Sequence, residues 1–441
     1  ANDLCGIASN PMEHGEASKL ALYGVADYNW NVSAYNAIDN WERSLVDVTP
    51  EAHDAYRTFA IHSCDTETGY RRIESWETKT FRLADYNKKD YDNLYAEFDR
   101  VEKVPAIMER DCKNALLMKE LRPWLIEFKK LGTRGKNTLT LMRDFKDGKY
   151  EAFWNGYINN RMSTADMAAY QAHKSGTMKL QPFYENGMDD MAVEFFKKVA
   201  GKTPAFYKGM GTYNSLSTTQ NKLMLDNDST TFYHSGASQN TGDWIGLDLG
   251  AVRPVREVRI LQGRNSVDDV DYFDNVIVEA SADGKTWTPL TGELQKTYII
   301  NWKGNPVEAR YVRMRKLQSD KKSWCAVREF VVNPVNPENL AFKVESADML
   351  GAMYCFDENP CSSFKSGGSL TFGVEKGTKS YTMLVNLPKA GSVVLKQYNN
   401  KGKLVASTPV EGNMAKVNVD ANAVKCQLEG AVEVFEIVPN K

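Results

Sequence analysis

Carboxylate and hydroxyl side chains are concentrated in one short run of the sequence, Asp226-Asn-Asp-Ser-Thr-Thr231. The carboxylates of Asp226 and Asp228 and the hydroxyl of Thr231 are oxygen ligands of the kind that a hard cation such as Ca²⁺ prefers. The same residue types also form Asx turns, in which a carboxylate accepts hydrogen bonds from the amides of its own turn. The run alone therefore indicates either a calcium site or a self-contained turn.

Two Asp-Asp pairs have the residue types that acid and base catalysis needs. Asp189-Asp190 lies in the first turn of a predicted helix, where acidic side chains interact favourably with the helix dipole. Asp268-Asp269 lies in a predicted polar loop. Neither pair follows a buried apolar strand, whose surroundings would raise a carboxyl pKa for acid catalysis. We therefore assign both pairs to structure or to contact with solvent.

Histidine and cysteine give no indication of a metal centre. The histidines without a partner at metal-ligand spacing, which we expect on helix surfaces or in the core, are His14, His53, His62 and His173. None of the seven cysteines forms a Cys-x-x-Cys pair, which argues against structural zinc. The spacing of Cys355 and Cys361 would allow a disulfide, and the odd total leaves at least one thiol.

The composition is that of folded globular domains. At roughly 150 residues per domain, 441 residues correspond to about three domains. The 55 basic and 57 acidic residues give a net charge of −2, so no basic excess exists to neutralise a nucleic acid backbone. No apolar run reaches the ~18–20 residues of a membrane-spanning helix. We therefore expect neither a nucleic acid partner nor a membrane span.

The periodicity of apolar residues changes near residue 202. Before it, apolar residues recur at helical spacing, as in the run from Ala17 to Tyr28, and predict an all-α bundle of six or seven helices over residues 13–202. After it, short runs alternate with period two, which predicts a jelly-roll sandwich over residues 203–334. A Pro-rich break follows, and a second, shortened β-sandwich is expected over residues 338–441.

An internal repeat links the two β regions. The run from Asp226 to Ser235 aligns without a gap to the run from Asp357 to Ser366, with Asn359 in place of Asp228. Downstream, the segment that begins at Trp244 has a rough counterpart at Tyr381. We interpret the tail as a second copy of the same sandwich, with chance similarity of two turn-rich segments as the alternative.

The first residues predict a strand that runs into a helix. Leu4–Ser9 is a short apolar run, and Asn10 and Pro11 have the residue types of an N-cap and a first helical position. A polar residue between a strand and a helix is how a β/α barrel presents ligand-binding side chains. An N-cap asparagine needs no substrate, however, so the spacing leaves both roles open. We expect residues 1–12 to be the last strand of a truncated barrel.

The run from Cys5 to Trp30, which begins Cys-Gly-Ile-Ala-Ser-Asn-Pro-Met-Glu-His-Gly, resembles the family 84 glycoside hydrolases, bacterial β-N-acetylglucosaminidases also described as hyaluronidase-like or O-GlcNAcase-like. The segments at His62–Asp65 and Gly69–Ser75 are similar to other signatures of that family. The resemblance implies that Asn10 hydrogen-bonds sugar hydroxyls. It also implies a retaining, substrate-assisted mechanism whose two adjacent aspartates lie on an earlier barrel strand, which this sequence lacks. We therefore expect the chain alone to be inactive.

Residues 205–334 resemble the discoidin-type (F5/8 type C) modules and carbohydrate-binding family 32, with galactose-binding-like folds. The segments that carry the resemblance are Gly242–Gly250, Glu279–Trp287 and Ala309–Arg315. The resemblance implies a structural Ca²⁺, and no cofactor for catalysis; its implied ligands are Asp226, Asp228, Thr231 and Glu329. The repeated copy is a weaker candidate, because Asn359 removes a charge and the later glutamate is out of register.

Sugar binding in such modules uses an aromatic face and polar side chains. Trp324 lies in a polar loop before the last strand of the first sandwich, where the family often places its stacking aromatic residue. The further loop candidates are Arg264, Asn265, His234 and Trp302. Trp244 and Trp287 lie within strand patterns, and we expect them in the core.

The resemblances together predict the carboxyl-terminal region of a β-N-acetylglucosaminidase, with a helical support domain and carbohydrate-binding-like modules. Its expected partners are GlcNAc- or Gal-containing glycans and the missing amino-terminal catalytic barrel. Such an enzyme would be secreted, periplasmic or at the cell surface. The alternative is a non-catalytic glycan-binding or interaction protein built from the same modules.

Overall fold

The computed structural model describes residue 9 and residues 13–63, 82–173, 179–217, 219–335, 340 and 342–441. The chain divides into two compact units, Ala1–Met191 and Ala192–Lys441, and each is described by itself. The predicted strand at residues 4–9, of which only Ser9 is described, and the candidate Asn10 lie outside these ranges, as does the motif at Gly69–Ser75.

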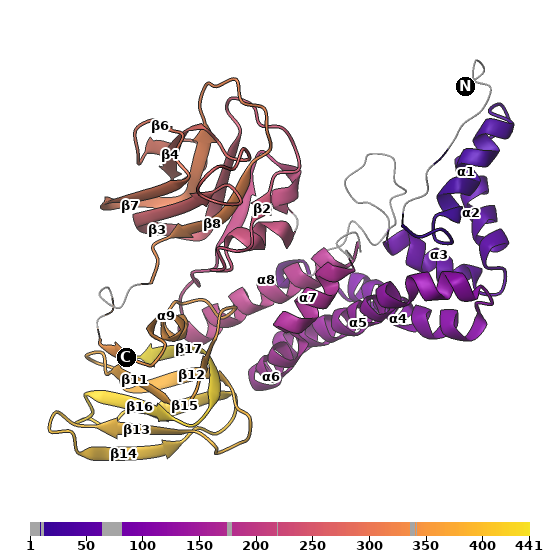
Figure 1. Ribbon diagram of the computed structural model, residues 1–441. Helices are drawn as coiled ribbons and strands as arrows, with labels where there is room; N and C mark the ends of the chain where they lie inside the picture. Colours follow the sequence, from indigo (N-terminus) through magenta and orange to yellow (C-terminus); the bar gives the residue numbers. More distant parts are fainter. Residues whose placement is uncertain are drawn as a thin grey trace. The chain divides into compact units, whose positions relative to one another are not determined.

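Helices make up the described part of the first unit, which confirms the predicted helical region (Figure 1). They are α1 (Lys19–Trp30), α2 (Ala37–Val48), α3 (His53–His62), the 3₁₀ turn η2 (Leu83–Asp85), α4 (Lys88–Asp111), α5 (Ala115–Lys146), α6 (Tyr150–Asn160), α7 (Thr164–Ala172) and α8 (Gln181–Ala200), which continues into the second unit. These eight α-helices of the described residues exceed the predicted six or seven.

The stretch Tyr150–Ala172 forms two helices, α6 and α7, because a capping box interrupts it. The Ser163 hydroxyl accepts a hydrogen bond from the Asp166 amide at 3.1 Å, and Asp166 Oδ2 accepts one from the Ser163 amide at 3.2 Å. This reciprocal pair begins α7. By contrast, Ala115–Lys146 forms the single long helix α5.

Helices α4 and α5 pack closely because α5 carries small residues at the contact. A Cβ atom on Gly135 would lie 2.1 Å from the ring of Phe98, which is fully buried on α4. His62 is also buried beside this core, and its Nε2 lies 2.7 Å from Glu97 Oε1. Burial lowers the pKa of His62, opposed by that hydrogen bond. The interpretation of His62 as a core residue is therefore confirmed.

The Asp189-Asp190 pair lies in the middle of α8, not in a first turn, because the helix already begins at Gln181. Asp190 Oδ2 accepts a hydrogen bond from the Leu83 amide at 3.1 Å. This carboxylate therefore fixes the turn before α4, a structural role as expected.

The first sandwich contains an antiparallel sheet in the order β2-β8-β3-β7-β4-β5, with β1 paired to β3 and β6 to β4 (Figure 1). Its strands are β1 (Lys208–Gly211), β2 (Tyr233–His234), β3 (Trp244–Gln262), β4 (Asn275–Ser281), β5 (Thr288–Pro289), β6 (Leu294–Gln295), β7 (Ile299–Lys316) and β8 (Ala326–Val332), and its 3₁₀ turns are η4 (Asn214–Ser217) and η5 (Thr219–Met224). The alternating residues of β3, β7 and β8 fill the core, with Leu247, Val312 and Phe330 among its members.

The second sandwich pairs a sheet in the order β10-β17-β12-β15 with a sheet in the order β14-β13-β16-β11-β9. Its elements are β9 (Val344–Glu345), α9 (Met349–Ala352), η7 (Met353–Cys355), β10 (Phe364–Ser366), β11 (Ser369–Gly373), β12 (Ser380–Asn386), β13 (Val394–Tyr398), β14 (Leu404–Pro409), β15 (Met414–Asn418), β16 (Lys425–Glu429) and β17 (Val432–Asn440). The predicted fold class, a helical bundle followed by two β-sandwiches, is confirmed.

The strand order β2-β8-β3-β7 of the first sandwich recurs as β10-β17-β12-β15 in the second. The repeated decapeptide therefore occupies the same place in both sheets. Strand β12 pairs with β17, and the end of β3 near Leu261 pairs with β8, which holds the place of β17 in the first sandwich. Strand β12 therefore corresponds to the end of β3, and the expected correspondence of Tyr381 with Trp244 is wrong.

The tryptophans of the first sandwich depart from expectation. Trp244 and Trp287 are partly exposed, not core residues, and the Arg313 guanidinium lies 3.7 Å from the Trp287 ring centre. Trp302 lies in strand β7 opposite Val258 and packs against the core, so it is not a loop residue. The length of β7 explains the position of Trp302, because this strand extends pairing into a segment predicted as a loop.

Cys355 and Cys361 remain thiols and are not joined by a disulfide. Within the described ranges, no helix is both long and apolar enough to cross a membrane.

Candidate functional site

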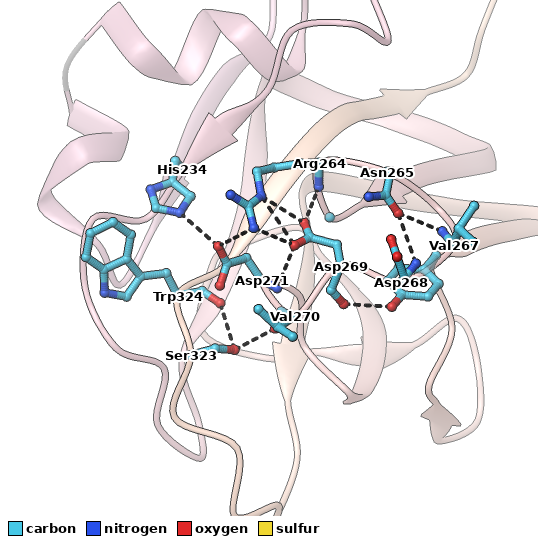
Figure 2. A network of polar contacts seen from close by, with 12 residues as sticks. His234, Arg264, Asn265, Val267, Asp268, Asp269, Val270, Asp271, Ser323 and Trp324 are labelled. Carbon is cyan, nitrogen blue, oxygen red and sulfur yellow. Dashed lines mark hydrogen bonds and ion pairs between the residues drawn. The ribbon is translucent and has the colours of Figure 1, made fainter.

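Three connections at one end of the first sandwich bring four of its polar and aromatic side chains together (Figure 2). His234 ends β2, Arg264 and Asp271 lie between β3 and β4, and Trp324 precedes β8. Because β2, β8 and β3 are neighbours in the sheet, residues far apart in sequence meet at this edge. The structure therefore groups three of the predicted sugar-contact residues and adds Asp271.

The aromatic part of the site is formed by Trp324 and His234. Their ring centres lie 4.6 Å apart with an interplanar angle of 63°, an edge-to-face arrangement. Trp324 is 46% exposed, although it is one of the largest apolar side chains of the domain. An exposed indole held edge-on by a second ring presents a flat apolar surface to solvent.

The polar part of the site is centred on Arg264 and two aspartates. Arg264 Nη2 lies 2.9 Å from Asp269 Oδ1 and 3.4 Å from Asp271 Oδ2 (Figure 2). His234 Nε2 lies 3.5 Å from the same Asp271 oxygen. Asp271 therefore joins the guanidinium to the aromatic pair, and Arg264 remains about half exposed.

Asp269 is the anchor that fixes Arg264. Its carboxylate is 2% exposed and accepts hydrogen bonds from the side chain and the amide of Arg264 and from the Asp271 amide at 3.2 Å. Burial alone would raise the pKa of Asp269, but these hydrogen bonds outweigh it and lower the pKa to about 2. Of the pair assigned to structure, Asp269 thus positions the site, whereas Asp268 is exposed.

Asn265 does not join this group. Its Oδ1 accepts hydrogen bonds from the amides of Val267 and Asp268 at 2.8 and 3.1 Å, so the side chain stabilises its own loop (Figure 2). The loop starts at Gly263, whose φ of +75° is unfavourable for other residues. The exposed Val267 and Val270 lie on the same loop.

Two buried residues that the sequence analysis did not identify, Gln239 and Lys316, fix the loops that carry Asp271 and Trp324. Gln239 is fully buried and donates hydrogen bonds to the carbonyls of Tyr272 and Trp324 at 3.1 and 3.0 Å. Its Oε1 accepts a hydrogen bond from the buried Lys316 ammonium at 2.9 Å. No sequence motif marks either residue, because an isolated glutamine or lysine is usually exposed.

The candidate calcium ligands lie in a separate turn before β2. Asp226 accepts hydrogen bonds from the Asp228 amide at 3.0 Å and from the Thr231 hydroxyl at 2.7 Å. Asp228 Oδ1 instead accepts from the amide and hydroxyl of Thr230, so this carboxylate faces its own turn. The Asp228 carbonyl lies 3.0 Å from the Thr231 hydroxyl.

Glu329 on β8 approaches this turn from the sheet. It is 6% exposed, and its Oε1 has no hydrogen-bond partner. Burial, followed by repulsion from Asp226 and Asp228, raises the pKa of Glu329 to about 7. The turn and the strand thus bring Asp226, Thr231 and Glu329 together. No cluster of three or more His, Cys, Asp or Glu ligands occurs in the described parts of the chain, in keeping with the direction of Asp228.

Family models match three segments of the chain. The model described as beta-N-acetylglucosaminidase matches residues 1–61, the bacterial GH84 post-catalytic domain matches residues 74–188, and the F5/8 type C domain matches residues 211–330. The chain combines segments of the family 84 glycoside hydrolases with an F5/8 type C domain. Both resemblances inferred from the sequence are therefore confirmed.

Solved structures with similar parts include CpGH84B, which is 22% identical over 42% of this chain and 33% of that chain, with a TM-score of 0.35. CpGH89CBM32-5 from Clostridium perfringens, in complex with GalNAc-beta-1,3-galactose, is 17% identical over 29% of this chain and 94% of that chain, with a TM-score of 0.24. The C-terminal domain of a chitobiase from Bacteroides fragilis is 22% identical over 29% of this chain and 92% of that chain, also with a TM-score of 0.24. All three TM-scores are below 0.5, so the family models carry the assignment.

The anchoring role of Asp269 in the F5/8 type C domain predicts an acid-dependent loss of stability. Because the folded pKa is lowered, Asp269 stabilises the domain above about pH 4, and this contribution is lost as the pH falls towards about 2. We expect Asp269→Asn to lower the free energy of unfolding at pH 7 by about 2 kcal/mol. Urea denaturation of the whole chain between pH 2 and 7 measures this effect.

Asp268→Asn is the matched control, because the carboxylate of Asp268 lies next to Asp269 in the sequence but is exposed. We expect the control to change stability by less than about 0.5 kcal/mol. Equal stability and equal acid profiles of the two variants would contradict the anchoring role.

Proposed function

We propose that the F5/8 type C domain binds a GlcNAc- or Gal-containing glycan at the site formed by His234, Arg264, Asp271 and Trp324. The observation that carries the proposal is the exposed Trp324 ring, held by His234 next to an arginine–aspartate pair. An aromatic face suits the apolar C–H face of a pyranose. Guanidinium donors and carboxylate acceptors suit its hydroxyl groups.

The arrangement favours sugar binding over a purely structural role for these residues. A large indole that is 46% exposed stabilises the fold less than a buried one would, yet its backbone is fixed by Gln239. Arg264 is likewise anchored at one side by Asp269 and exposed at the other. Fixed side chains lose little entropy on binding, which increases affinity for a small ligand.

The whole chain belongs, in this proposal, to a retaining β-N-acetylglucosaminidase with a substrate-assisted mechanism, in which the helical region supports the catalytic part. The family 84 segments support this assignment. Hydrolysis would need a barrel with two adjacent aspartates, since Asp189-Asp190 lies on a helix and Asp269 is engaged with Arg264. Asn10, outside the described residues, remains a predicted contact to sugar hydroxyls. A secreted, periplasmic or cell-surface location fits an enzyme that acts on glycoconjugates.

A structural calcium ion at Asp226, Thr231 and Glu329 is a further part of the proposal. The buried, unpartnered Glu329 Oε1 fits a cation, because an ionised buried carboxylate is costly without a positive partner. The Asp228 carbonyl is a suitable neutral ligand, whereas its carboxylate is engaged by Thr230. When bound, the ion would fix the turn before β2, the strand that carries His234.

Trp324→Ala should weaken glycan binding at least about tenfold, because the substitution removes the apolar face of the site. Glycan-array screening identifies the ligand, and isothermal titration calorimetry measures its affinity. Trp30→Ala is the matched control, since this indole is 90% exposed and lies outside the F5/8 type C domain. Unchanged affinity in the Trp324 variant would refute the proposed site.

Removal of calcium with EDTA should lower the melting temperature of the F5/8 type C domain, because a ligand that binds only the folded state stabilises it, by about 2.7 kcal/mol at a concentration of 100 Kd. The effect should be absent in Glu329→Gln and present in Glu308→Gln, a control at an exposed position of β7. Tryptophan fluorescence follows the transition, since four of the nine tryptophans lie in this domain and none follows Trp324. An EDTA effect of the same size in Glu329→Gln would rule out this site.

The chain should not hydrolyse a chromogenic GlcNAc glycoside, since neither of its aspartate pairs is placed for catalysis. Release of the chromophore over hours, compared with a buffer blank, is the measurement. Turnover that disappears in Asp189→Asn or Asp269→Asn would show that one of these pairs is catalytic after all.

A further inference from the structure

The turn at Asp357 in the second sandwich has the same hydrogen bonds as the turn at Asp226 in the first. Asp357 accepts hydrogen bonds from the Asn359 amide at 2.9 Å and from the Ser362 hydroxyl at 2.7 Å, as Asp226 does from Asp228 and Thr231. The Asn359 carbonyl lies 3.0 Å from the Ser362 hydroxyl, the same distance as in the first copy. The residue after each aspartate has a positive φ, 58° at Asn227 and 61° at Glu358.

The loss of a charge at Asn359 does not weaken this second turn. Asn359 Oδ1 accepts a hydrogen bond from the Cys361 amide at 3.0 Å, as Asp228 Oδ1 accepts one from the Thr230 amide at 2.9 Å. The side chain at this position faces its own turn in both copies. The ligand it offers is its backbone carbonyl, which is the same in asparagine and aspartate.

The expectation that the later glutamate is out of register is wrong, because Glu436 on β17 takes the place of Glu329 on β8. Phe364 pairs with Val434 as Tyr233 pairs with Val327, and each glutamate follows its valine by two residues. The linear alignment misses this equivalence because the connection between the turn and the last strand is shorter in the second copy.

A β-bulge confirms the equivalence of the two glutamates. Glu329 pairs with Leu261 and Glu436 with Leu384, and in each ladder the register shifts immediately after that pair. The extra residue of the bulge is Arg328 in β8 and Phe435 in β17. A bulge redirects the side chains next to it, so both strands turn a glutamate towards the aspartate of the turn.

Glu436 is buried more completely than Glu329. It is 3% exposed, its Oε2 has no hydrogen-bond partner, and it shares a hydrogen bond with Asp357. The nearby Lys202 pairs with Glu358 at 2.5 Å, and Arg253 lies 4.0 Å from the same carboxylate. Two carboxyl groups in this position need either a shared proton or a cation.

We infer that the second sandwich binds one Ca²⁺ ion through Asp357, Ser362, Glu436 and the carbonyl of Asn359. Two carboxylates, a hydroxyl and a carbonyl form the all-oxygen set that Ca²⁺ prefers, with further positions open to water. The site lies outside the segment that the F5/8 type C family model matches. It needs neither glycan binding nor catalysis by the rest of the chain.

The number of calcium ions bound per chain tests this inference. Equilibrium dialysis of the whole chain, freed of metal with a chelator, should give two ions for the unmodified protein and one for Glu436→Gln. Glu433→Gln is the matched control on the same strand, because Glu433 accepts hydrogen bonds from Ser363 and Asn386 and should leave two ions bound. Ser362→Ala keeps both carboxylates and should weaken the second site about tenfold.

Glu329→Gln separates this site from the one proposed in the first sandwich. One ion retained in Glu329→Gln and lost in the double variant with Glu436→Gln supports the inference, even if the first site proves empty. Calcium binding that is equal in the unmodified chain, Glu436→Gln and Ser362→Ala would overturn it. In that case Asp357 and Glu436 share a proton, and Glu436→Gln should be at least as stable as the unmodified chain in the presence of calcium. Circular dichroism verifies that each variant is folded.

Discussion

Each β-sandwich of this chain buries a glutamate, Glu329 or Glu436, against an aspartate in a turn. The desolvation of an ionised carboxylate is costly, and the cost rises when a second carboxylate lies beside it. This constraint determines the local architecture. The turn must present hydroxyl and carbonyl oxygens, and the strand must bulge so that the glutamate points inward rather than along the sheet. The first β-strand after the turn is positioned as a consequence, and in the first sandwich that strand carries His234.

The proposed glycan site depends on a second set of buried polar contacts. Gln239 and Lys316 hold the backbones of the loops, and Asp269 holds Arg264. These three residues touch no proposed ligand, yet they fix the groups that do. The exposed side chains can thus be rigid although they lie in loops. Rigid loops on a sheet scaffold are the usual location of binding residues, because loops tolerate sequence change while the scaffold holds their ends.

Sequence reasoning predicted the order of the domains and the residue types of the glycan site, because periodicity and turn residues are local signals. It named His234, Arg264 and Trp324, which the structure brings together at or beside the ends of strands. It also named Asn265 and Trp302, which do not join them. It missed Gln239 and Asp271, whose importance comes from contacts across the sheet. It placed Trp244 in the core because an alternating pattern does not tell which face of a strand is covered. It placed Trp287 there because it took residue 287 as part of a strand, whereas β5 begins only at Thr288. The equivalence of Glu436 and Glu329 was invisible for a similar reason: only strand pairing, not linear spacing, aligns them.

The matching bulges in β8 and β17 separate what the two sandwiches share from what differs between them. The bulge and its glutamate persist, whereas Lys365 occupies the position of His234 on the paired strand. The two sandwiches therefore share the inner turn and glutamate but differ at the position of a proposed glycan contact. To design a ligand site in the second sandwich, a protein engineer would therefore change only the loops between its strands. The strands and the buried carboxyl groups of Asp357 and Glu436 could be kept.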